Sequence, residues 1–194
     1  MTKQLRGTQT TEKILRATRE EIITRGIRKT SISSITKRCG ITRSLFYHYF
    51  ENLDAVIYAT LDDVIDDFLA ELRDWNSKRV EGDIEKSLFD AVKLLHRIIN
   101  NDGPFRAGLN KDSNAELYVR FLNRTARRIA HYISNTTVIE FKNKHKTDLK
   151  HIEDTFYVLI VGLTALIRSK PDISIEELVE IAAQSLHLNK YLTN

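Results

Sequence analysis

The sequence predicts an all-α protein in two parts, a small N-terminal domain of three helices over residues 1–52 and a C-terminal helical bundle over residues 53–194. Only two prolines and seven glycines interrupt the 194 residues, so few positions force a helix to end. Apolar residues also recur every three or four positions along most of the chain. Residues 1–50 hold eleven Lys and Arg against three Glu, whereas the remainder holds nineteen against twenty-three acidic residues. A basic module on an acidic body suits a polyanionic partner, although a solvated basic surface would have the same charge.

The first helix is expected to begin at a threonine. Thr10 or Thr11 can accept a hydrogen bond from an early backbone N–H, which makes either one a candidate N-cap. Ile14 and Ile22 then fall at helical spacing, and Gly26 is a typical residue for the end of a helix. We therefore expect a helix that starts after residue 10 or 11 and ends before residue 26.

Two short helices are expected to follow. The β-branched content of residues 30–35 would suit a strand, but a Ser/Thr cluster in front of Ile32 and Ile35 favours a capped helix. Gly40 interrupts that helix, and Thr42 can cap the next one. We expect the three helices to share a small core, made of Ile14, Ile22, Ile27, Ile32, Ile35, Ile41, Phe46 and Phe50.

Residues 30–50, TSISSITKRCGITRSLFYHYF, have the layout of a helix-turn-helix. Two short helices meet at a tight turn that contains glycine, and the second helix is rich in hydroxyl, basic and aromatic side chains. In a helix-turn-helix the second helix lies in the major groove of DNA, with its N-terminal residues against base edges. The motif therefore favours DNA binding over a merely solvated basic surface.

At this point the chain resembles the TetR family of transcriptional regulators over about residues 11–56. The likeness combines spacing, glycine placement and an unusual aromatic cluster: Glu12-Lys13-Ile14-Leu15, Arg25-Gly26, Thr30-Ser31-Ile32, Ile35, Gly40 and Phe46-Tyr47-His48-Tyr49-Phe50. The resemblance implies a DNA-binding transcriptional regulator, most often a repressor that a small-molecule effector releases from its operator. Beyond residue 56 the chain resembles the family only in length and helical content.

The resemblance also implies roles for single residues. Thr30 or Ser31 would touch a phosphate at the start of the second helix, where helix N-termini favour anions. Arg43 and Ser44 stand where the family reads bases, and an arginine can pair bidentately with guanine. The expected DNA-binding set is Thr30, Ser31, Thr42, Arg43, Ser44, Tyr47, His48 and Tyr49, with backbone contacts from the two tyrosines. Lys3 and Arg6 would add contacts from a flexible arm.

Two residues depart from the family pattern. Leu45 stands where the family often has threonine, and Leu53 stands where a phosphate-binding lysine usually opens the fourth helix. Neither leucine can bind phosphate, and Glu51 adds negative charge beside them. Fewer contacts with DNA are therefore expected around Leu45 and Leu53. The alternative is that the chain has lost its operator and acts as a helical interaction protein.

The body is expected to contain five helices, over residues 53–75, 84–99, 114–141, 149–168 and 174–188. Residues 100–108 are irregular and are a candidate for a mobile pocket entrance, and residues 141–146 form a polar, Lys-rich loop or frayed turn. Polar and aromatic groups on otherwise apolar helices suggest a pocket for an unidentified effector: His96, Tyr118, Phe121, Asn123 and Tyr157.

The last two helices carry broad apolar stripes. The resemblance implies that they form the interface of a homodimer, whose two-fold symmetry would match a near-palindromic double-stranded DNA operator. The expected interface is Phe156, Ile160, Leu163, Ile167, Val179, Ala182, Ala183 and Leu186. The alternative is that these stripes form a core within one chain.

Several other classes of function are not expected. A single cysteine, Cys39, excludes an internal disulfide and a cysteine-based zinc site, and its position suits a packed thiol. The histidines lack metal-ligand spacing and no Ser-His-Asp set is found, so we expect no metal, no cofactor and no enzymatic activity. The uncharged stretch 155–167 is too short for a bilayer, and no apolar run follows the basic N-terminus, so no membrane contact and a cytoplasmic location are expected.

Overall fold

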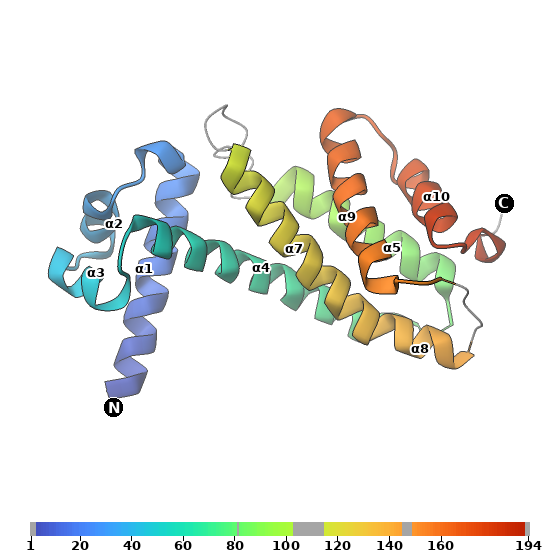
Figure 1. Ribbon diagram of the computed structural model, residues 1–194, viewed down its shortest axis with the longest axis horizontal. Helices are drawn as coiled ribbons and strands as arrows, with labels where there is room; N and C mark the ends of the chain where they lie inside the picture. Colours follow the sequence, from blue (N-terminus) through green and yellow to red (C-terminus); the bar gives the residue numbers. More distant parts are fainter. Residues whose placement is uncertain (1–2, 81, 103–114, 145–148, 193–194) are drawn as a thin grey trace. The chain divides into compact units, whose positions relative to one another are not determined.

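A computed structural model describes residues 3–80, 82–102, 115–144 and 149–192 (Figure 1). Every regular element in those ranges is a helix, which confirms the predicted all-α class. The chain divides into two compact units, the first containing residues 1–67 and the second beginning at Phe68. Each unit has a hydrophobic core of its own.

Helix α1 spans Lys3–Arg25, so it begins earlier than predicted. Thr10 and Thr11 lie inside the helix and do not cap it, and Lys3 and Arg6, which were predicted on a flexible arm, belong to the helix. The helix ends at Gly26, whose φ of 77° is a conformation that glycine adopts without strain. A short 3₁₀ turn, η1 (Ile27–Lys29), leads to the next helix.

Helices α2 (Ile32–Cys39) and α3 (Arg43–Tyr49) are both capped as predicted. The Ser31 hydroxyl accepts a hydrogen bond of 3.1 Å from the backbone N–H of Ser34, and the Thr42 hydroxyl accepts one of 3.1 Å from that of Leu45. Between the helices, Gly40 adopts a left-handed φ of 64°. The helix-turn-helix prediction for residues 30–50 is therefore confirmed, and the alternative of a strand is not.

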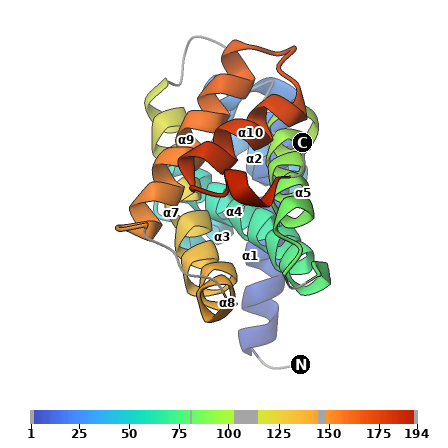
Figure 2. The same cartoon turned by 90° about the vertical axis from the view of Figure 1, so that its right-hand side faces the viewer.

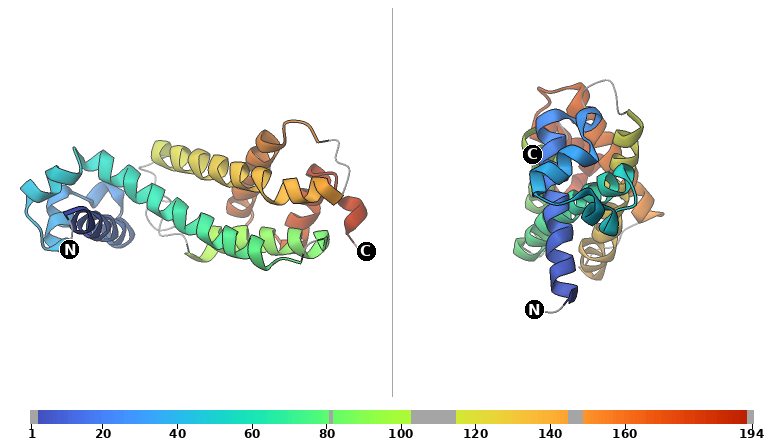
Figure 3. Two further views of the ribbon diagram at one scale, coloured as in Figure 1. Left: turned by 90° about the horizontal axis from the view of Figure 1, so that it is seen from below. Right: turned by 90° about the vertical axis from the view of Figure 1, so that its left-hand side faces the viewer.

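The core of the first unit is made of side chains from all three helices, whose ribbons are drawn in Figure 3 (right panel). Its buried residues include four of the eight predicted core residues, and two more, Ile32 and Ile41, pack against it partly buried. Val56 adds the first turns of the following helix. The buried residues are Ile14, Ala17, Ile35, Cys39, Phe46, Phe50 and Val56. Cys39 is buried, as expected for a packed thiol, and burial raises its pKa. The thiol is therefore held in its neutral, unreactive form.

Helix α4 (Leu53–Lys78) is one continuous helix that contributes to both units. The division falls after Asp67, inside the helix, whereas the sequence suggested a boundary before residue 53. Packing explains the difference, because Val56 is fully buried in the core of the first unit. The guanidinium of Arg19 also donates a hydrogen bond of 2.6 Å to the Asp67 carboxylate, which ties α1 to the same stretch of α4.

The second unit contains the rest of the bundle. Its elements are α5 (Ile84–Arg97), a π-helical turn η2 (Ile98–Asp102), α7 (Ala115–Asn135), α8 (Thr137–Lys144), α9 (Ile152–Ser169), α10 (Ile175–Ser185) and a 3₁₀ turn η3 (Asn189–Tyr191). Helix α10 packs beside α5 and α9 (Figure 2). The residues buried between them include Val92, Leu163, Ile167, Leu178, Val179 and Ala182. None of the described helices is long and apolar enough to span a bilayer.

The helix predicted over residues 114–141 is interrupted at Thr136, so that prediction was wrong in its continuity. The hydroxyl of Thr136 donates a hydrogen bond of 2.7 Å to the carbonyl of Tyr132, and the Asn135 amide donates one of 2.8 Å to that of His131. Side chains that bond back to the preceding turn favour a helix end. Helix α8 then continues to Lys144, so the expected polar loop is helical over residues 141–144, and its last two residues lie outside the described ranges. Residues 103–108 of the expected pocket entrance also lie outside them, whereas Asn100 belongs to η2.

Candidate nucleic-acid interface

Helix α3 presents one polar face to solvent. Its Phe46 ring is completely buried and contacts Phe50 with ring centroids 5.8 Å apart, which anchors the helix to the core. The residues on the other side of the helix are exposed, namely Thr42, Arg43, Ser44, Leu45, Tyr47 and His48. Tyr49 differs from them, because it is half-buried and packs against the core. Six of the eight residues predicted to bind DNA therefore lie on or next to one short helix, and five of those six are exposed.

Arg43, like Arg28, has no ion pair within the described part of the chain. Arg19, by contrast, bonds to Asp67, while Arg25 and Arg38 both approach the buried Glu21. Arg28 and Lys29 on η1, and Lys37 on α2, are exposed. Sequence reasoning did not single out these three residues, although the positive charge of residues 1–50 was a signal that could have found them.

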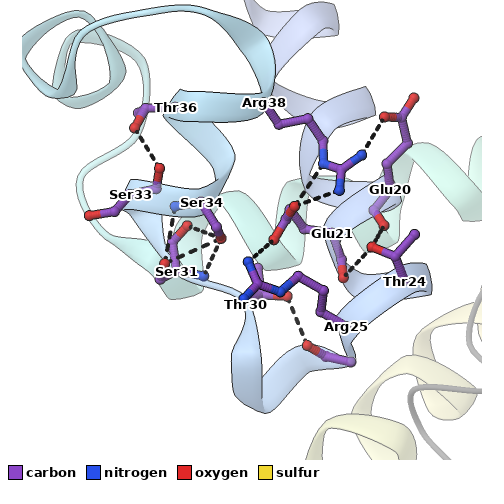
Figure 4. A network of polar contacts seen from close by, with 11 residues as sticks. Glu20, Glu21, Thr24, Arg25, Thr30, Ser31, Ser33, Ser34, Thr36 and Arg38 are labelled. Atoms are coloured by element: carbon purple, nitrogen blue, oxygen red, sulfur yellow. Dashed lines mark hydrogen bonds and ion pairs between the residues drawn. The ribbon is translucent and has the colours of Figure 1, made fainter.

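Glu21 is the centre of a polar network that joins α1 to α2 (Figure 4). Arg38 donates a hydrogen bond of 2.7 Å from Nε to the Glu21 carboxylate, and Arg25 lies 3.5 Å from it. Burial raises the pKa of Glu21, but the hydrogen bonds from Arg38 and Ser34 and the two positive charges outweigh burial, so its pKa is below the ordinary value of 4.5. The ionised carboxylate thus holds α2, including its capped N-terminus, against α1.

The two candidates for a phosphate contact at α2 differ in accessibility. Thr30 is buried, and its hydroxyl donates a hydrogen bond of 2.9 Å to the carbonyl of Gly26. Thr30 therefore stabilises the turn before α2 and is not available to DNA, which corrects its place in the predicted set. Ser31 is exposed at the helix N-terminus and remains the candidate.

The two leucines that depart from the family pattern lie in different surroundings. Leu53 packs against the core of the first unit, so its apolar side chain is accounted for by burial. Leu45 is 40% exposed on the polar face of α3. An exposed leucine offers apolar contact but no hydrogen bond, which is compatible with contact to a thymine methyl and not to a phosphate.

The second unit contains a cavity of about 150 Å³ between the C-terminal end of α4, the start of α5, the α7–α8 junction and the start of α9. Its lining is predominantly apolar and includes Leu88, Ala91, Ile133, Phe141 and Phe156. Trp75, near the end of α4, and Arg79, just after that helix, complete one wall. This is a place where a small molecule could be enclosed.

The residues predicted to bind a ligand do not line this cavity, although two of them, Tyr157 and Asn123, contact each other outside it. The Tyr157 hydroxyl donates a hydrogen bond of 2.8 Å to Asn123 at the surface, while Phe121 packs edge-on to Phe68. His96 lies in a separate shallow depression, and Tyr118, at the N-terminal end of α7, is grouped with the first unit. The prediction selected polar groups on apolar helices, but the rotation of each helix about its axis decides which of these side chains lie close together.

The predicted dimer interface needs a similar correction. Seven of its eight residues are buried within one chain: Ile160, Leu163, Ile167, Val179, Ala182, Ala183 and Leu186. The eighth, Phe156, is half-buried and lines the cavity. The alternative of an intramolecular core holds for these residues. The solvent-facing side of the same helices carries other apolar or small residues, namely Val158, Gly162 and Ala165 on α9 and Ile181 on α10.

Comparisons with known proteins agree with this geometry. Residues 14–59 match the family model for bacterial regulatory proteins of the tetR family. A search of curated proteins gave no match. Among solved structures, the fatty acid degradation regulator FadR from Bacillus halodurans aligns with a TM-score of 0.60 and 16% identity, covering 91% of this chain and 93% of that one.

Two further structures have the same fold. RolR, solved in complex with resorcinol, aligns with a TM-score of 0.59 and 17% identity over 96% of this chain and 95% of its own. A TetR family transcription regulator from Marinobacter aquaeolei aligns with a TM-score of 0.53 and 18% identity over 94% and 98%. The N-terminal domain of the chain therefore matches the model of the TetR family of bacterial transcriptional regulators, and the chain as a whole has the fold of the aligned regulators.

Proposed function

We propose that the protein is a homodimeric, cytoplasmic repressor that binds a near-palindromic operator and leaves it when a small molecule occupies the second unit. The observation that carries the proposal is α3, a short helix whose buried Phe46 leaves Arg43, Ser44 and Tyr47 exposed together. A helix of this kind fits the major groove, where base edges differ from one base pair to the next.

Arg43 is the principal base-reading residue of the proposal. Its guanidinium has no ion pair to give up within the described part of the chain, so binding to DNA replaces only water. A bidentate pair with guanine O6 and N7 is the contact that arginine makes most often. Ser44 and Tyr47, on the same exposed helix, add a hydroxyl and an apolar ring that can approach neighbouring bases or the backbone.

Phosphate contacts are proposed to come from around α3. Ser31 and Thr42 are exposed N-cap residues, and each hydroxyl can rotate so that its hydrogen points toward a phosphate oxygen. The backbone N–H groups of a helix N-terminus also favour an anion. Lys37, Arg28 and Lys29 are exposed positive charges of the same domain. Such contacts position a protein on DNA without reading its sequence.

The homodimer is proposed to form through the solvent-facing side of α9 and α10. Val158 is 66% exposed and Ile181 is 37% exposed, both high values for apolar side chains. Gly162 and Ala165 follow Val158 by four and seven residues, so these three residues lie on one stripe of α9 and allow a second helix to approach closely. A second copy with the same stripe would cover it by two-fold symmetry and present two α3 helices to one operator.

Release by an effector is proposed to act through α4. Its first turns carry Val56, in the core of the DNA-binding unit, and its last turns carry Trp75, in the cavity wall, with Arg79 of the same wall just after the helix. A ligand that prefers one position of α4 would shift the population of spacings between the two α3 helices. The ligand can release the protein from DNA only if it binds the released state more tightly than the DNA-bound state.

The proposal is tested by selecting DNA from a random duplex library with the full-length protein, followed by titration of the enriched sequence in 150 mM salt. We expect enrichment of an inverted repeat that binds at least about a thousand times more tightly than random duplex. A reporter gene behind the enriched sequence then measures the direction of regulation. Equal affinity for all duplexes, together with a stable protein partner, would instead favour the helical interaction protein suggested by Leu45.

A further inference from the structure

The cavity of the second unit is small and built for an apolar occupant. Its volume of about 150 Å³ is bounded by side chains of α5, α7, α8 and α9, among them Leu88, Ile133 and Phe141. Engineered protein cavities of roughly this volume accept a benzene molecule. The space therefore suits a molecule with one ring and a few substituents.

The charged groups of the wall already have polar partners. The Arg79 side chain is only 9% exposed and is ion-paired with Glu140, and its Nε donates a hydrogen bond of 2.9 Å to Asn76. Thr137 donates a hydrogen bond of 2.8 Å to the same Asn76 oxygen. Asp83 accepts a hydrogen bond of 3.0 Å from a backbone N–H as the cap of α5. A charged ligand would have to displace one of these partners or lose its hydration uncompensated, so an uncharged ligand is favoured.

One polar group of the wall remains unsatisfied. The indole N–H of Trp75 is buried and has no hydrogen-bond partner in the part of the chain that the structure describes. A buried donor without an acceptor is costly, and native proteins rarely leave one unpaired without a reason. The nitrogen has almost no accessible surface, so a ligand oxygen would reach it only after the indole ring turns toward the cavity, and accepting its hydrogen would then remove the cost.

We propose that the cavity binds an uncharged, single-ring molecule that carries a carbonyl or hydroxyl oxygen as acceptor for the Trp75 N–H. This inference rests on the proposed role of the second unit as the effector domain, and it names the chemical class of the effector. Apolar contact with the ring supplies most of the affinity, and the Trp75 hydrogen bond orients the molecule.

Trp75 also makes the test direct, because it is the only tryptophan of the chain. Cyclohexanone, a neutral ring with one acceptor, absorbs only weakly where tryptophan is selectively excited, so fluorescence of the full-length protein, corrected for that absorption, can report its binding. We expect a saturable change in emission with cyclohexanone, and affinity at least about tenfold lower for cyclohexanecarboxylate. In calorimetry, Trp75→Phe should weaken cyclohexanone binding by about 2- to 12-fold.

A cavity-filling variant separates this site from others. Ala91→Leu should abolish saturable binding, while Ala70→Leu, at an exposed position of the α4 helix, should leave it unchanged; circular dichroism checks that both fold. Loss of binding in Ala91→Leu alone supports the proposal whether or not the protein selects an operator. Absence of saturable binding, or tighter binding of the carboxylate, overturns it even if operator selection succeeds, so the two proposals fail separately.

Discussion

Replacing Arg43 by alanine tests whether α3 reads bases. The Arg43 side chain is exposed and has no ion pair within the described residues, so Arg43→Ala should change the free energy of unfolding by less than about 0.5 kcal/mol. A bidentate arginine–guanine pair contributes roughly 1–3 kcal/mol of discrimination. A homodimer inserts two such residues, so the affinity for the selected operator should fall by about 2–6 kcal/mol, or about 30-fold to 20,000-fold.

The assay is fluorescence anisotropy of a labelled operator and of a scrambled duplex at one salt concentration. Arg43→Ala should bring the two affinities together. Lys37→Ala is the matched control, because it also removes one exposed positive charge but lies on α2; it should weaken both duplexes alike and lower the salt dependence by about one ion per protomer. Equal losses on both duplexes in Arg43→Ala would refute base reading by this residue and leave only an electrostatic role.

Three further predictions follow from the described contacts. Phe46→Ala removes a fully buried ring and should lower the free energy of unfolding by about 3–5 kcal/mol in chemical denaturation, whereas Ala at its neighbour Tyr47, 49% exposed, should cost far less; similar losses would contradict the burial argument. The pKa of Glu21 in the folded protein is below its ordinary value of 4.5, so its contribution to stability is complete above pH 4.5 and is lost as the pH falls through the lowered pKa. In thermal melts at decreasing pH, Glu21→Gln should therefore reduce this acid-dependent loss of stability, whereas Glu20→Gln should not. Val158→Glu should convert the dimer to a monomer in sedimentation velocity, with Val80→Glu, at a valine 63% exposed outside α9 and α10, as a control that stays dimeric; a dimer that persists in Val158→Glu would place the interface elsewhere.

The helix caps and the turn of the first unit could be predicted from the sequence because each of these residue patterns favours one local structure. A hydroxyl before an apolar-periodic run, as at Ser31 and Thr42, accepts a backbone N–H, and a glycine such as Gly40 permits a left-handed turn. The start of α1 was missed for the opposite reason. Thr10 can cap a helix but can also continue one, and nothing local forbids the additional turns before it.

The sequence did not show which side of each helix in the second unit faces the core and which faces solvent. Helix α9 is apolar over most of its circumference, so its pattern does not distinguish the side that carries Ile160 from the side that carries Val158. Likewise, Trp75 was not predicted to line a cavity, because the cavity depends on how the α7–α8 junction folds back, and that depends on Thr136. The asparagine and two threonines at residues 135–137 were a usable sign of the junction, since such side chains compete for backbone partners.

The inert thiol of Cys39 has a practical consequence for measuring how far apart the recognition helices stand. Cys39 is the only cysteine, its residue is 4% exposed, and burial raises its pKa. Alkylating reagents should therefore not react with it in the native protein. Ser44→Cys would then be the one reactive thiol of each protomer, with no need to remove the native one. A nitroxide attached there would give, by pulsed electron resonance, the separation between labels in free, operator-bound and cyclohexanone-bound samples.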